Sequence, residues 1–222
     1  MIKGYYINLE ERKDRVQHFE ELKIKYPFFK DVERIPAIRN ENGAIGCGFS
    51  HIKALNKCLD CHDDYMMVFE DDFCILNNNN YNEFIKYFEN IRDEKEWDII
   101  VLTPRGDTKC VDTKCVEAEA KSNTIERMNS NYFHEIVNNQ TATGYIIKKS
   151  FIPILINSFK KSVEGLLKNQ NPDIYAIDQY WKPLQQIHHF YYFKKVFAGQ
   201  LIGYSSIEKR LVNYNQRFLS QS

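Results

Sequence analysis

One stretch limits the possible folds of this chain more than any other. It is the apolar run Tyr65–Phe69, which ends in three consecutive carboxylates, Glu70, Asp71 and Asp72. Five large residues in a row, aromatic and β-branched types among them, predict a strand buried on both faces. Side chains alternate along a strand, so Glu70 and Asp72 point to one side and Asp71 to the other. Adjacent buried charges are costly unless a cation neutralises them, and carboxylate oxygens suit a hard divalent ion. The sequence therefore predicts a metal and phosphate site here.

The composition is that of a globular chain. Its 222 residues are 43% hydrophobic, and no Pro/Gly/Ser-rich linker divides them, which predicts a single domain over residues 1–222. Thirty basic residues balance thirty acidic ones, so nothing predicts binding to nucleic acid or to an anionic membrane. No signal-peptide core and no run of about 18 uncharged apolar residues is found, which predicts no membrane span. We expect a cytoplasmic protein, or one of the host cytoplasm or virion if it is viral; the sequence makes no prediction of oligomeric state.

The N-terminal residues 2–7 predict a first strand, followed by Asn8 as the N-cap of a helix. Arg12 and Arg15 share one face of that helix and lie near the carboxyl end of the strand. Ligands bind at that edge of open α/β sheets, so the two arginines are candidates to hold a phosphate. A solvated basic helix face is the alternative.

A glycine-rich segment around Gly43, Gly46 and Gly48 matches neither a Walker loop nor the dinucleotide fingerprint. It predicts a turn ahead of a helix over residues 49–62, with Ser50 and His51 in the first turn. Free amide groups in a first turn attract anions, so both residues are candidate ligand contacts. The alternative is that His51 packs or caps.

Strands alternate with helices along the rest of the chain. Residues 97–102 predict a buried strand, residues 107–130 a polar surface insertion able to close over a ligand, and residues 132–137 and 142–147 two strands joined as a hairpin. This alternation predicts an α/β layer fold of the nucleotide-binding kind.

Two further candidates lie in the last third of the chain. Asp178 stands among large apolar and aromatic residues, and burial there would raise its proton affinity and suit a general base, with a helix cap as the alternative. His189 follows His188 just before a predicted strand, as a further metal ligand or a structural residue.

The segment Cys58–His62 matches the spacing for covalent haem attachment. Two acidic neighbours and the lack of a second Cys-x-x-Cys argue against haem or zinc there and favour a helix end with buried thiols.

Six short motifs occur in a specific order. They are Tyr6–Leu9 followed by Arg12 and Arg15, then Ile35–Ala37, Gly46–His51, Val68–Asp72, Trp97–Ile99 and Thr143–Ile147. In this order and spacing they resemble glycosyltransferase family 25, the lipooligosaccharide and procollagen galactosyltransferase group. The resemblance covers about the first 150 residues and continues more loosely through Asp178.

This resemblance implies an α/β fold of the GT-A type, with a mixed, mostly parallel central sheet flanked by helices. It implies a Mn²⁺- or Mg²⁺-dependent enzyme that transfers a hexose, galactose or glucose, from a UDP-sugar with inversion. The acceptor would be a glycan, a protein or a lipid-linked sugar. Residues 1–103 would form the nucleotide-sugar half, and residues 104–222 the acceptor side. A bacterial or large-virus member, as in lipopolysaccharide biosynthesis, fits the absence of a signal.

The resemblance also assigns roles to individual residues. Asp72 would be the metal ligand, and Glu70 and Asp71 would face the metal's waters or the donor ribose. Inversion by single displacement needs one base to take the proton of the acceptor hydroxyl, and Asp178 is the candidate for that role. The residues that would lie by the nucleotide are Asn8, Arg12, Arg15, Ser50 and His51. Among the metal ligands we also count Glu70 and His189.

Two other classes of function stay open. The same fold without turnover would be a glycan- or nucleotide-binding protein. A nucleotidyltransferase shares acidic metal motifs, but it usually needs a glycine-rich phosphate loop after the first strand, and residues 8–15 contain no glycine.

Overall fold

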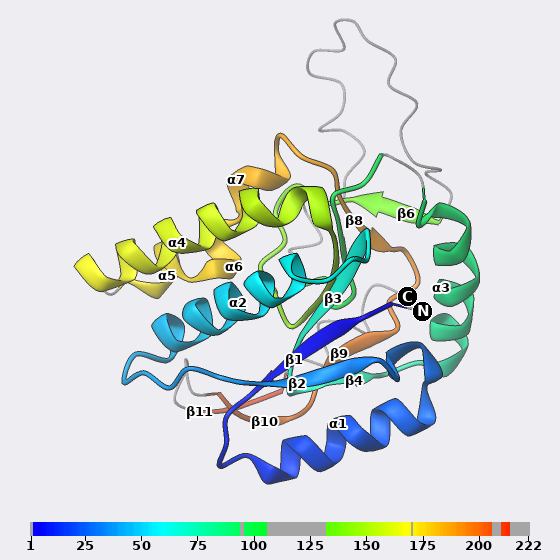
Figure 1. The fold of residues 1–222 in the computed structure, drawn as a ribbon, viewed down its shortest axis with the longest axis horizontal. Helices are drawn as coiled ribbons and strands as arrows, with labels where there is room; N and C mark the ends of the chain where they lie inside the picture. The colour runs from blue at the N-terminus through cyan, green and yellow to red at the C-terminus, as the bar shows by residue number, and fades with distance from the viewer. Residues whose placement is uncertain (1, 94–95, 106–131, 170, 206–209, 214–222) are drawn as a thin grey trace, which may run out of the picture.

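The computed structural model describes residues 2–93, 96–105, 132–169, 171–205 and 210–213 (Figure 1). The insertion predicted at residues 107–130 lies outside the described residues. The strands are β1 (Gly4–Asn8), β2 (Val32–Pro36), β3 (Tyr65–Glu70), β4 (Phe73–Ile75), β5 (Ile99–Val101), β6 (Phe133–Glu135), β7 (Gly144–Lys148), β8 (Phe190–Phe193), β9 (Ala198–Gln200), β10 (Gly203–Ser205) and β11 (Arg210–Val212). The α-helices are α1 (Lys13–Lys25), α2 (Gly43–Leu59), α3 (Asn78–Ile91), α4 (Ile152–Asn169), α5 (Pro172–Tyr175), α6 (Ile177–Tyr180) and α7 (Lys182–Gln185), and short 3₁₀ turns lie at η1 (Pro27–Phe29) and η4 (Lys149–Phe151).

The main sheet has seven strands within the described residues, in the order β2-β1-β3-β7-β5-β8-β6. Strands β2, β1, β3, β5 and β8 run in one direction, and β7 and β6 run in the other. This confirms the predicted α/β class with a mixed, mostly parallel sheet. The predicted hairpin of β6 and β7 is wrong, because β5 and β8 lie between these two strands. Strand β6 pairs with β8, and β7 pairs with β3 and β5. These partners are far apart in sequence, so nothing in the local sequence indicates which strands pair.

Helices cover both faces of the sheet, with α1 and α3 on one face and α2 and α4 on the other (Figure 1). The alternation along β3 shows why. Met67 and Phe69 join the core beneath α1 and α3, and Met66 and Val68 join the core beneath α2 and α4, and all four are fully buried. A strand buried on both faces has no polar face, so the first polar side chains that follow it lie where the strand leaves the core.

Helix α2 begins six residues earlier than the sequence predicts. Its N-cap is Asn42, whose side-chain oxygen accepts a hydrogen bond from Ala44 N at 3.0 Å. The glycines that look like a turn are helical, and Gly48 serves close packing. A Cβ at Gly48 would lie 2.5 Å from Val163 Cγ2 of α4. Ser50 and His51 therefore lie in the middle of the helix, and the prediction that free first-turn amides surround them is wrong.

The C-terminal strands return to the end of β3. Strand β9 pairs antiparallel with β4, and Leu201 N donates a hydrogen bond to the carbonyl of Asp72 at 2.7 Å. Strands β10 and β11 form a separate two-stranded sheet after it. Residues 198–203 are thus placed beside the acidic strand end, although about 130 residues separate the two segments along the chain.

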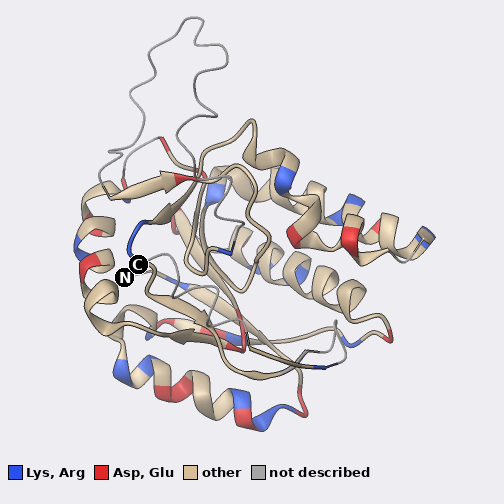
Figure 2. Ribbon diagram, turned by 180° about the vertical axis from the view of Figure 1, so that it is seen from behind, with Lys and Arg blue, Asp and Glu red and all other residues tan. Residues whose placement is uncertain are grey.

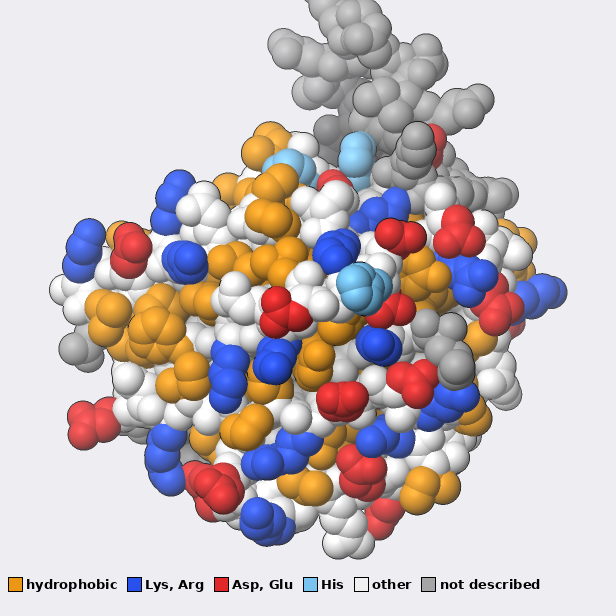
Figure 3. All heavy atoms as spheres, in the orientation of Figure 1, with side chains coloured by type: hydrophobic (Ala, Val, Ile, Leu, Met, Phe, Trp, Pro, Cys, Tyr) orange, Lys and Arg blue, Asp and Glu red, His pale blue; other side chains and the backbone are white. Residues whose placement is uncertain are grey.

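Charged side chains of both signs are distributed over the helices, as along α1 (Figure 2). On the face seen in Figure 3, acidic and basic side chains are likewise mixed. Among the described helices, none combines the length and the apolar character needed to cross a bilayer.

Candidate active site

A cavity of about 890 Å³ opens at the carboxyl ends of β1 and β3. Segments from the whole chain line it: the β1–α1 turn, the β2–α2 loop, one side of α2, the end of β3, the residues before β7, helices α5 and α6, and the β9–β10 segment. The charged residues in its lining are Arg12, Arg15, Arg39, Glu70, Asp71, Asp72, Arg105, Asp173 and Asp178. Oppositely charged groups therefore face one enclosed space, which is where a charged ligand can be bound by contacts on several sides.

Glu70 is the last residue of β3 and is held by three side chains. Cys47 Sγ and His51 Nε2 each lie 3.4 Å from Glu70 Oε1, and Thr143 Oγ1 donates to Glu70 Oε2 at 3.1 Å. Burial alone would raise the pKa of Glu70, but the hydrogen bond and charge of His51, with the bonds from Thr143 and Cys47, bring that pKa below its ordinary value. Glu70 is therefore a fixed anion with little capacity to take a proton near neutral pH.

Asp71 is held from the other side by Asn8, whose Nδ2 donates to Asp71 Oδ2 at 2.7 Å. Asn8 ends β1 and is 1% exposed, and its Oδ1 accepts a bond from Arg34 Nε at 2.8 Å. Asn8 is thus no helix cap, because α1 begins at Lys13. Burial raises the pKa of Asp71, although the Asn8 bond and the charges of Arg15 and Arg12 oppose this shift. The structure places Asn8 behind the carboxylate, outside the cavity lining.

Asp72 has the least satisfied carboxylate of the three. Among the described residues its Oδ1 is buried without a hydrogen-bond partner, and its Oδ2 receives only a long bond of 3.4 Å from Gln200. Burial, followed by the negative charges of Glu70 and Asp71, raises the pKa of Asp72 to about 8. A buried oxygen without a partner beside two other carboxylates is the environment that a divalent cation would satisfy.

The two predicted arginines both reach the cavity but are held differently. Arg12 makes two hydrogen bonds to Asp14, at 2.9 and 2.8 Å, and its side chain is 33% exposed. Arg15 is 6% exposed, and among the described residues its Nε has no hydrogen-bond partner. Its guanidinium packs against Gly203 of β10, where a Cβ would collide with Nη2. Arg15 is thus a buried cation next to the acidic strand end.

Ser50 and His51 both line the cavity but have different roles. Ser50 Oγ donates to Gly46 O at 2.6 Å and accepts from Ile38 N at 2.8 Å, which ties the β2–α2 loop to α2. His51 is fully buried, with Nε2 toward Glu70 and Nδ1 3.2 Å from the hydroxyl of Tyr145. Ser50 therefore shapes the wall, and His51 orients Glu70.

Asp178 lines the cavity and belongs to α6, which lies across the molecule from α1 (Figure 1). Burial, followed by the negative charge of Glu70, raises the pKa of Asp178 to about 7, although the charges of Arg105 and Lys182 oppose this shift. Glu70 and Asp178 thus line one cavity with pKa values that their surroundings push in opposite directions, the pattern that distinguishes a fixed anion from a group able to exchange a proton.

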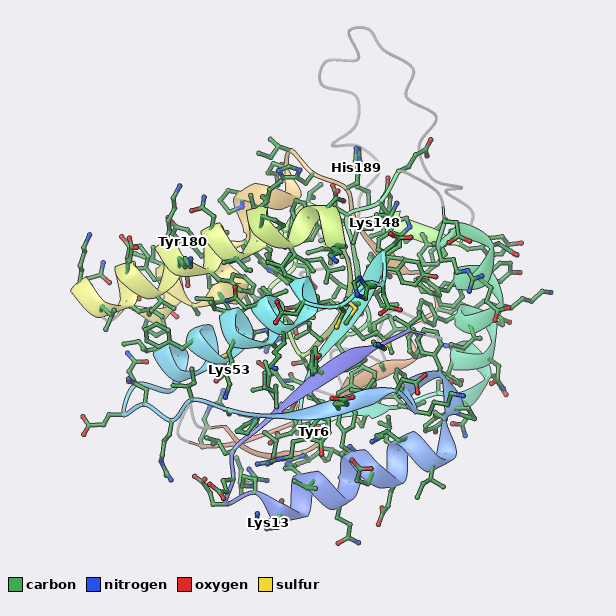
Figure 4. All side chains as sticks on the ribbon, viewed as in Figure 1. Tyr6, Lys13, Lys53, Lys148, Tyr180 and His189 are labelled. Carbon is green, nitrogen blue, oxygen red and sulfur yellow. The ribbon has the colours of Figure 1, made fainter. Side chains whose placement is uncertain are left out.

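The structure does not bring His189 to this site. It precedes β8, which runs parallel to β5, and its backbone N–H donates to Asp98 Oδ2 at 2.9 Å. His189 therefore lies at the amino ends of the parallel strands, whereas the cavity lies at their carboxyl ends. It is near Lys148 and far from Lys13 at the start of α1 (Figure 4). The prediction of His189 as a metal ligand is corrected accordingly, because the direction of β8 turns its amino end away from Asp72.

Sequence reasoning missed several lining residues. Cys47 and Thr143 hold Glu70, Gln200 contacts Asp72, and Arg105 follows β5. The sequence could have indicated Arg105, because it follows a buried strand in the same way as Asp72 does, and ligand-binding residues gather at the carboxyl ends of such strands. Gln200 had none, since its strand reaches the site only through pairing with β4.

Comparison with known proteins gives a family. The profile of glycosyltransferase family 25 (LPS biosynthesis protein) matches residues 39–181. That range contains Ser50, His51, Glu70–Asp72 and Asp178. A search among curated proteins found no match.

Three solved structures are similar to this chain. A glycosyltransferase involved in the glycosylation of the major capsid of PBCV-1 is 11% identical with a TM-score of 0.43, and the alignment covers 94% of this chain and 96% of that one. The UDP-glucose pyrophosphorylase of Acinetobacter baumannii is 9% identical with a TM-score of 0.39, covering 95% and 68%. Mannose-1-phosphate geranyltransferase from Thermus thermophilus is 9% identical with a TM-score of 0.36, covering 87% and 59%.

Proposed function

Because this chain belongs to glycosyltransferase family 25 and so acts in glycosyl transfer, we propose that its cavity binds a UDP-sugar and transfers the hexose, galactose or glucose, with inversion. The acceptor is the hydroxyl of a glycan, a protein or a lipid-linked sugar. In this proposal the fold is of the GT-A type and the reaction depends on Mn²⁺ or Mg²⁺. The observation that carries it is the pairing, in one cavity, of an incompletely satisfied Asp72 with the buried cation of Arg15.

The charges around the acidic strand end support a donor diphosphate. Arg12 and Arg15 supply two permanent positive charges from α1, and guanidinium groups bind phosphate oxygens by charge-assisted hydrogen bonds. Among the described residues, the Nε of Arg15 makes no hydrogen bond, and its ion pair with Asp14 Oδ2 is long, at 3.9 Å. A diphosphate placed between α1 and the end of β3 would satisfy that donor.

The carboxylates support a metal ion at the same place. Asp72, with Glu70 as the second carboxylate, would hold the ion, which would supply positive charge to neutralise the negative charge on the leaving diphosphate. Asn8 then acts by orienting Asp71, and Ser50 by holding the cavity wall. His189 has no part in this proposal.

Asp178 is the proposed general base. The acceptor oxygen attacks the anomeric carbon on the face opposite the diphosphate, its proton passes to Asp178 Oδ, and the sugar–oxygen bond breaks with its electron pair leaving on the diphosphate. A pKa of about 7 leaves a large fraction of Asp178 ionised at neutral pH while keeping it basic enough to take the proton. Glu70 is the weaker base, because three side chains already stabilise its anion.

Release of UDP from UDP-galactose and UDP-glucose, measured with purified protein with and without Mn²⁺, tests the proposal. We expect slow hydrolysis of one of these donors, stimulated by the metal and by candidate acceptors. Asp72→Asn should lose the metal stimulation, whereas Lys57→Gln, at an exposed position of α2 outside the cavity lining, should keep it.

Two outcomes would replace the proposal by another. Tight binding of UDP-sugars with neither hydrolysis nor transfer would indicate a nucleotide-binding protein without turnover. Release of pyrophosphate from a nucleoside triphosphate and a sugar phosphate would indicate a nucleotidyltransferase.

A further inference from the structure

Three side chains of different chemistry converge at one wall of the cavity. Cys47 and His51 lie one turn apart on α2, and Glu70 faces them from the end of β3. The Cys47 sulfur, a His51 nitrogen and a Glu70 oxygen all lie within 4.8 Å of one another. A thiol, an imidazole and a carboxylate are the three ligand types of protein zinc sites.

The distances fit a tetrahedral ion. Bond lengths of about 2.3 Å for Zn–S, 2.0 Å for Zn–N and 2.1 Å for Zn–O require ligand atoms roughly 3.4 to 3.6 Å apart. Cys47 Sγ and His51 Nε2 are each 3.4 Å from Glu70 Oε1. Two of the three pairs of ligand atoms therefore already have the required separation, and the third pair, Cys47 Sγ and His51 Nε2, lies within 4.8 Å. The ligands are carried by a 17-residue helix and a central strand.

The surrounding residues orient two of these ligands. The Tyr145 hydroxyl lies 3.2 Å from His51 Nδ1, the nitrogen that points away from the cluster, and the two rings stack at an angle of 17°. Thr143 Oγ1 holds the second oxygen of Glu70 at 3.1 Å. Metal-binding histidines and carboxylates are usually fixed by such outer hydrogen bonds, which set the histidine tautomer.

We propose that Cys47, His51 and Glu70 form a binding site for Zn²⁺ or a similar borderline-soft divalent ion, with the fourth position open toward the cavity. On binding, the Cys47 thiol releases its proton to solvent, and His51 gives up the Nε2 proton that faces Glu70 and carries its proton on Nδ1, facing Tyr145, so that Nε2 can coordinate. The site shares Glu70 with the proposed carboxylate site at Asp72, but its chemistry is different, because sulfur and nitrogen ligands select against Mg²⁺. Its existence does not depend on the transfer reaction.

Cobalt titration of the metal-free protein tests this site directly. Co²⁺ substitutes for Zn²⁺ and gives a thiolate-to-metal charge-transfer band when sulfur is a ligand. We expect the band to saturate at one equivalent and to disappear on addition of Zn²⁺, but to persist in a large excess of Mg²⁺. Absence of the band, or its loss with Mg²⁺, would overturn the proposal.

Variants identify the ligands. Cys47→Ser should abolish the band and weaken Zn²⁺ binding by about 100-fold or more, since even the loss of an outer hydrogen bond costs about 10- to 100-fold. The matched control is Cys61→Ser, which removes a half-buried thiol two residues beyond the end of α2 and should keep the band. A band that survives in Cys47→Ser would place the metal on another cysteine and overturn the assignment.

Two conservative variants keep the test independent of folding. Tyr145→Phe should leave the band in place and lower Zn²⁺ affinity by about 10- to 100-fold. Asp63→Asn should leave both the band and the affinity unchanged, because Asp63 lies outside the cavity lining and pairs with Lys3. Circular dichroism and thermal melting of each metal-free variant separate a lost ligand from a lost fold. Unchanged zinc affinity in both Cys47→Ser and His51→Gln, with the fold intact, would contradict the site.

Discussion

At the scale of single residues, three carboxylates that line the same cavity differ in the partners that surround them. Glu70 has three side-chain donors, Asp72 has one long contact, and Asp178 faces the charges of Arg105 and Lys182. Their proton affinities differ accordingly, although their side chains are nearly identical. The chemistry of the site is therefore set by neighbours contributed from α2, the loop before β7 and the C-terminal strands.

The pH dependence of transfer should report Asp178. A base acts in its deprotonated form, so with a pKa of about 7 the value of kcat/KM should rise with pH through about 7 and level off above it. Asp178→Asn should lower turnover by about 10²- to 10⁴-fold while UDP binding is retained. The matched control is Asp63→Asn, a carboxylate outside the cavity that pairs with Lys3 at 4.0 Å. Retained turnover in Asp178→Asn would move the base elsewhere.

The stability of the metal-free protein should reveal the cost of Asp72. Its pKa is raised on folding from 3.8 to about 8, so the folded protein binds the proton more tightly than the unfolded chain does. The charged form therefore destabilises the fold progressively as pH rises from about 4 to about 8. Without metal, Asp72→Asn should melt at a higher temperature than the wild type at pH 8.5, and the difference should vanish near pH 4. A lower melting temperature at pH 8.5 would contradict the assigned environment.

Part of this site could be predicted from local sequence, and part could not. Glu70–Asp72, Arg12 and Arg15 follow buried strands or begin the next helix. The rule that ligands bind at the carboxyl ends of parallel strands is therefore enough to bring them together. His189 was misplaced because a residue beside a strand faces either edge, depending on the direction of that strand. Thr143 precedes β7 and Gln200 ends β9, and the strands that pair with β7 and β9, β3 and β4, are remote in sequence.

At the scale of elements, the contact between α2 and α4 decides where the cavity wall stands. Gly48 allows α4 to approach, and Ile177 of the Asp178-bearing helix α6 lies against the same glycine, since a Cβ there would be 3.4 Å from Ile177 Cγ2. The sequence suggested a glycine-rich turn because glycine is common in turns. The structure uses the missing side chain for helix packing, and only the fold shows that use.

Gly48→Ala should therefore overpack this contact. The added methyl would lie 2.5 Å from Val163 Cγ2, and such overpacking costs about 1 to 3 kcal/mol. We expect a lower free energy of unfolding in urea titrations and, because α6 is displaced, a lower kcat. Val163→Ala removes the atom that collides, so the double variant Gly48→Ala/Val163→Ala should recover part of both losses. Additive losses in the double variant would show that the collision is not the cause.

At the scale of the whole molecule, the cavity joins segments from both ends of the chain. The β1–α1 turn and the β9–β10 segment meet where Gly203 packs on Arg15. A ligand bound between them stabilises the complete fold, because it binds the folded protein and not the unfolded chain. Global stability is thus a readout of donor binding even when no acceptor is known.

Thermal melting should show this coupling. UDP and Mn²⁺ together, each at about 100 times its dissociation constant, should add about 2.7 kcal/mol and raise Tm by roughly 5 to 10 °C for a chain of this size. UDP alone should give a smaller shift, and Asp72→Asn should show no added effect of Mn²⁺. Equal shifts for UDP with and without the metal would argue against a metal between the carboxylates and the diphosphate.

The hydrogen bond from Leu201 N to the carbonyl of Asp72 also has a consequence for synthesis on the ribosome. The three carboxylates at the end of β3, Glu70 to Asp72, are synthesised about 130 residues before the segment that closes over them. At roughly 5 to 20 residues per second, the acidic strand end waits about 6 to 26 seconds in contact with water. During that time its charges are hydrated. The burial that raises the pKa of Asp72 to about 8 is complete only after this late segment has docked, because Gln200 and Leu201 both contact Asp72.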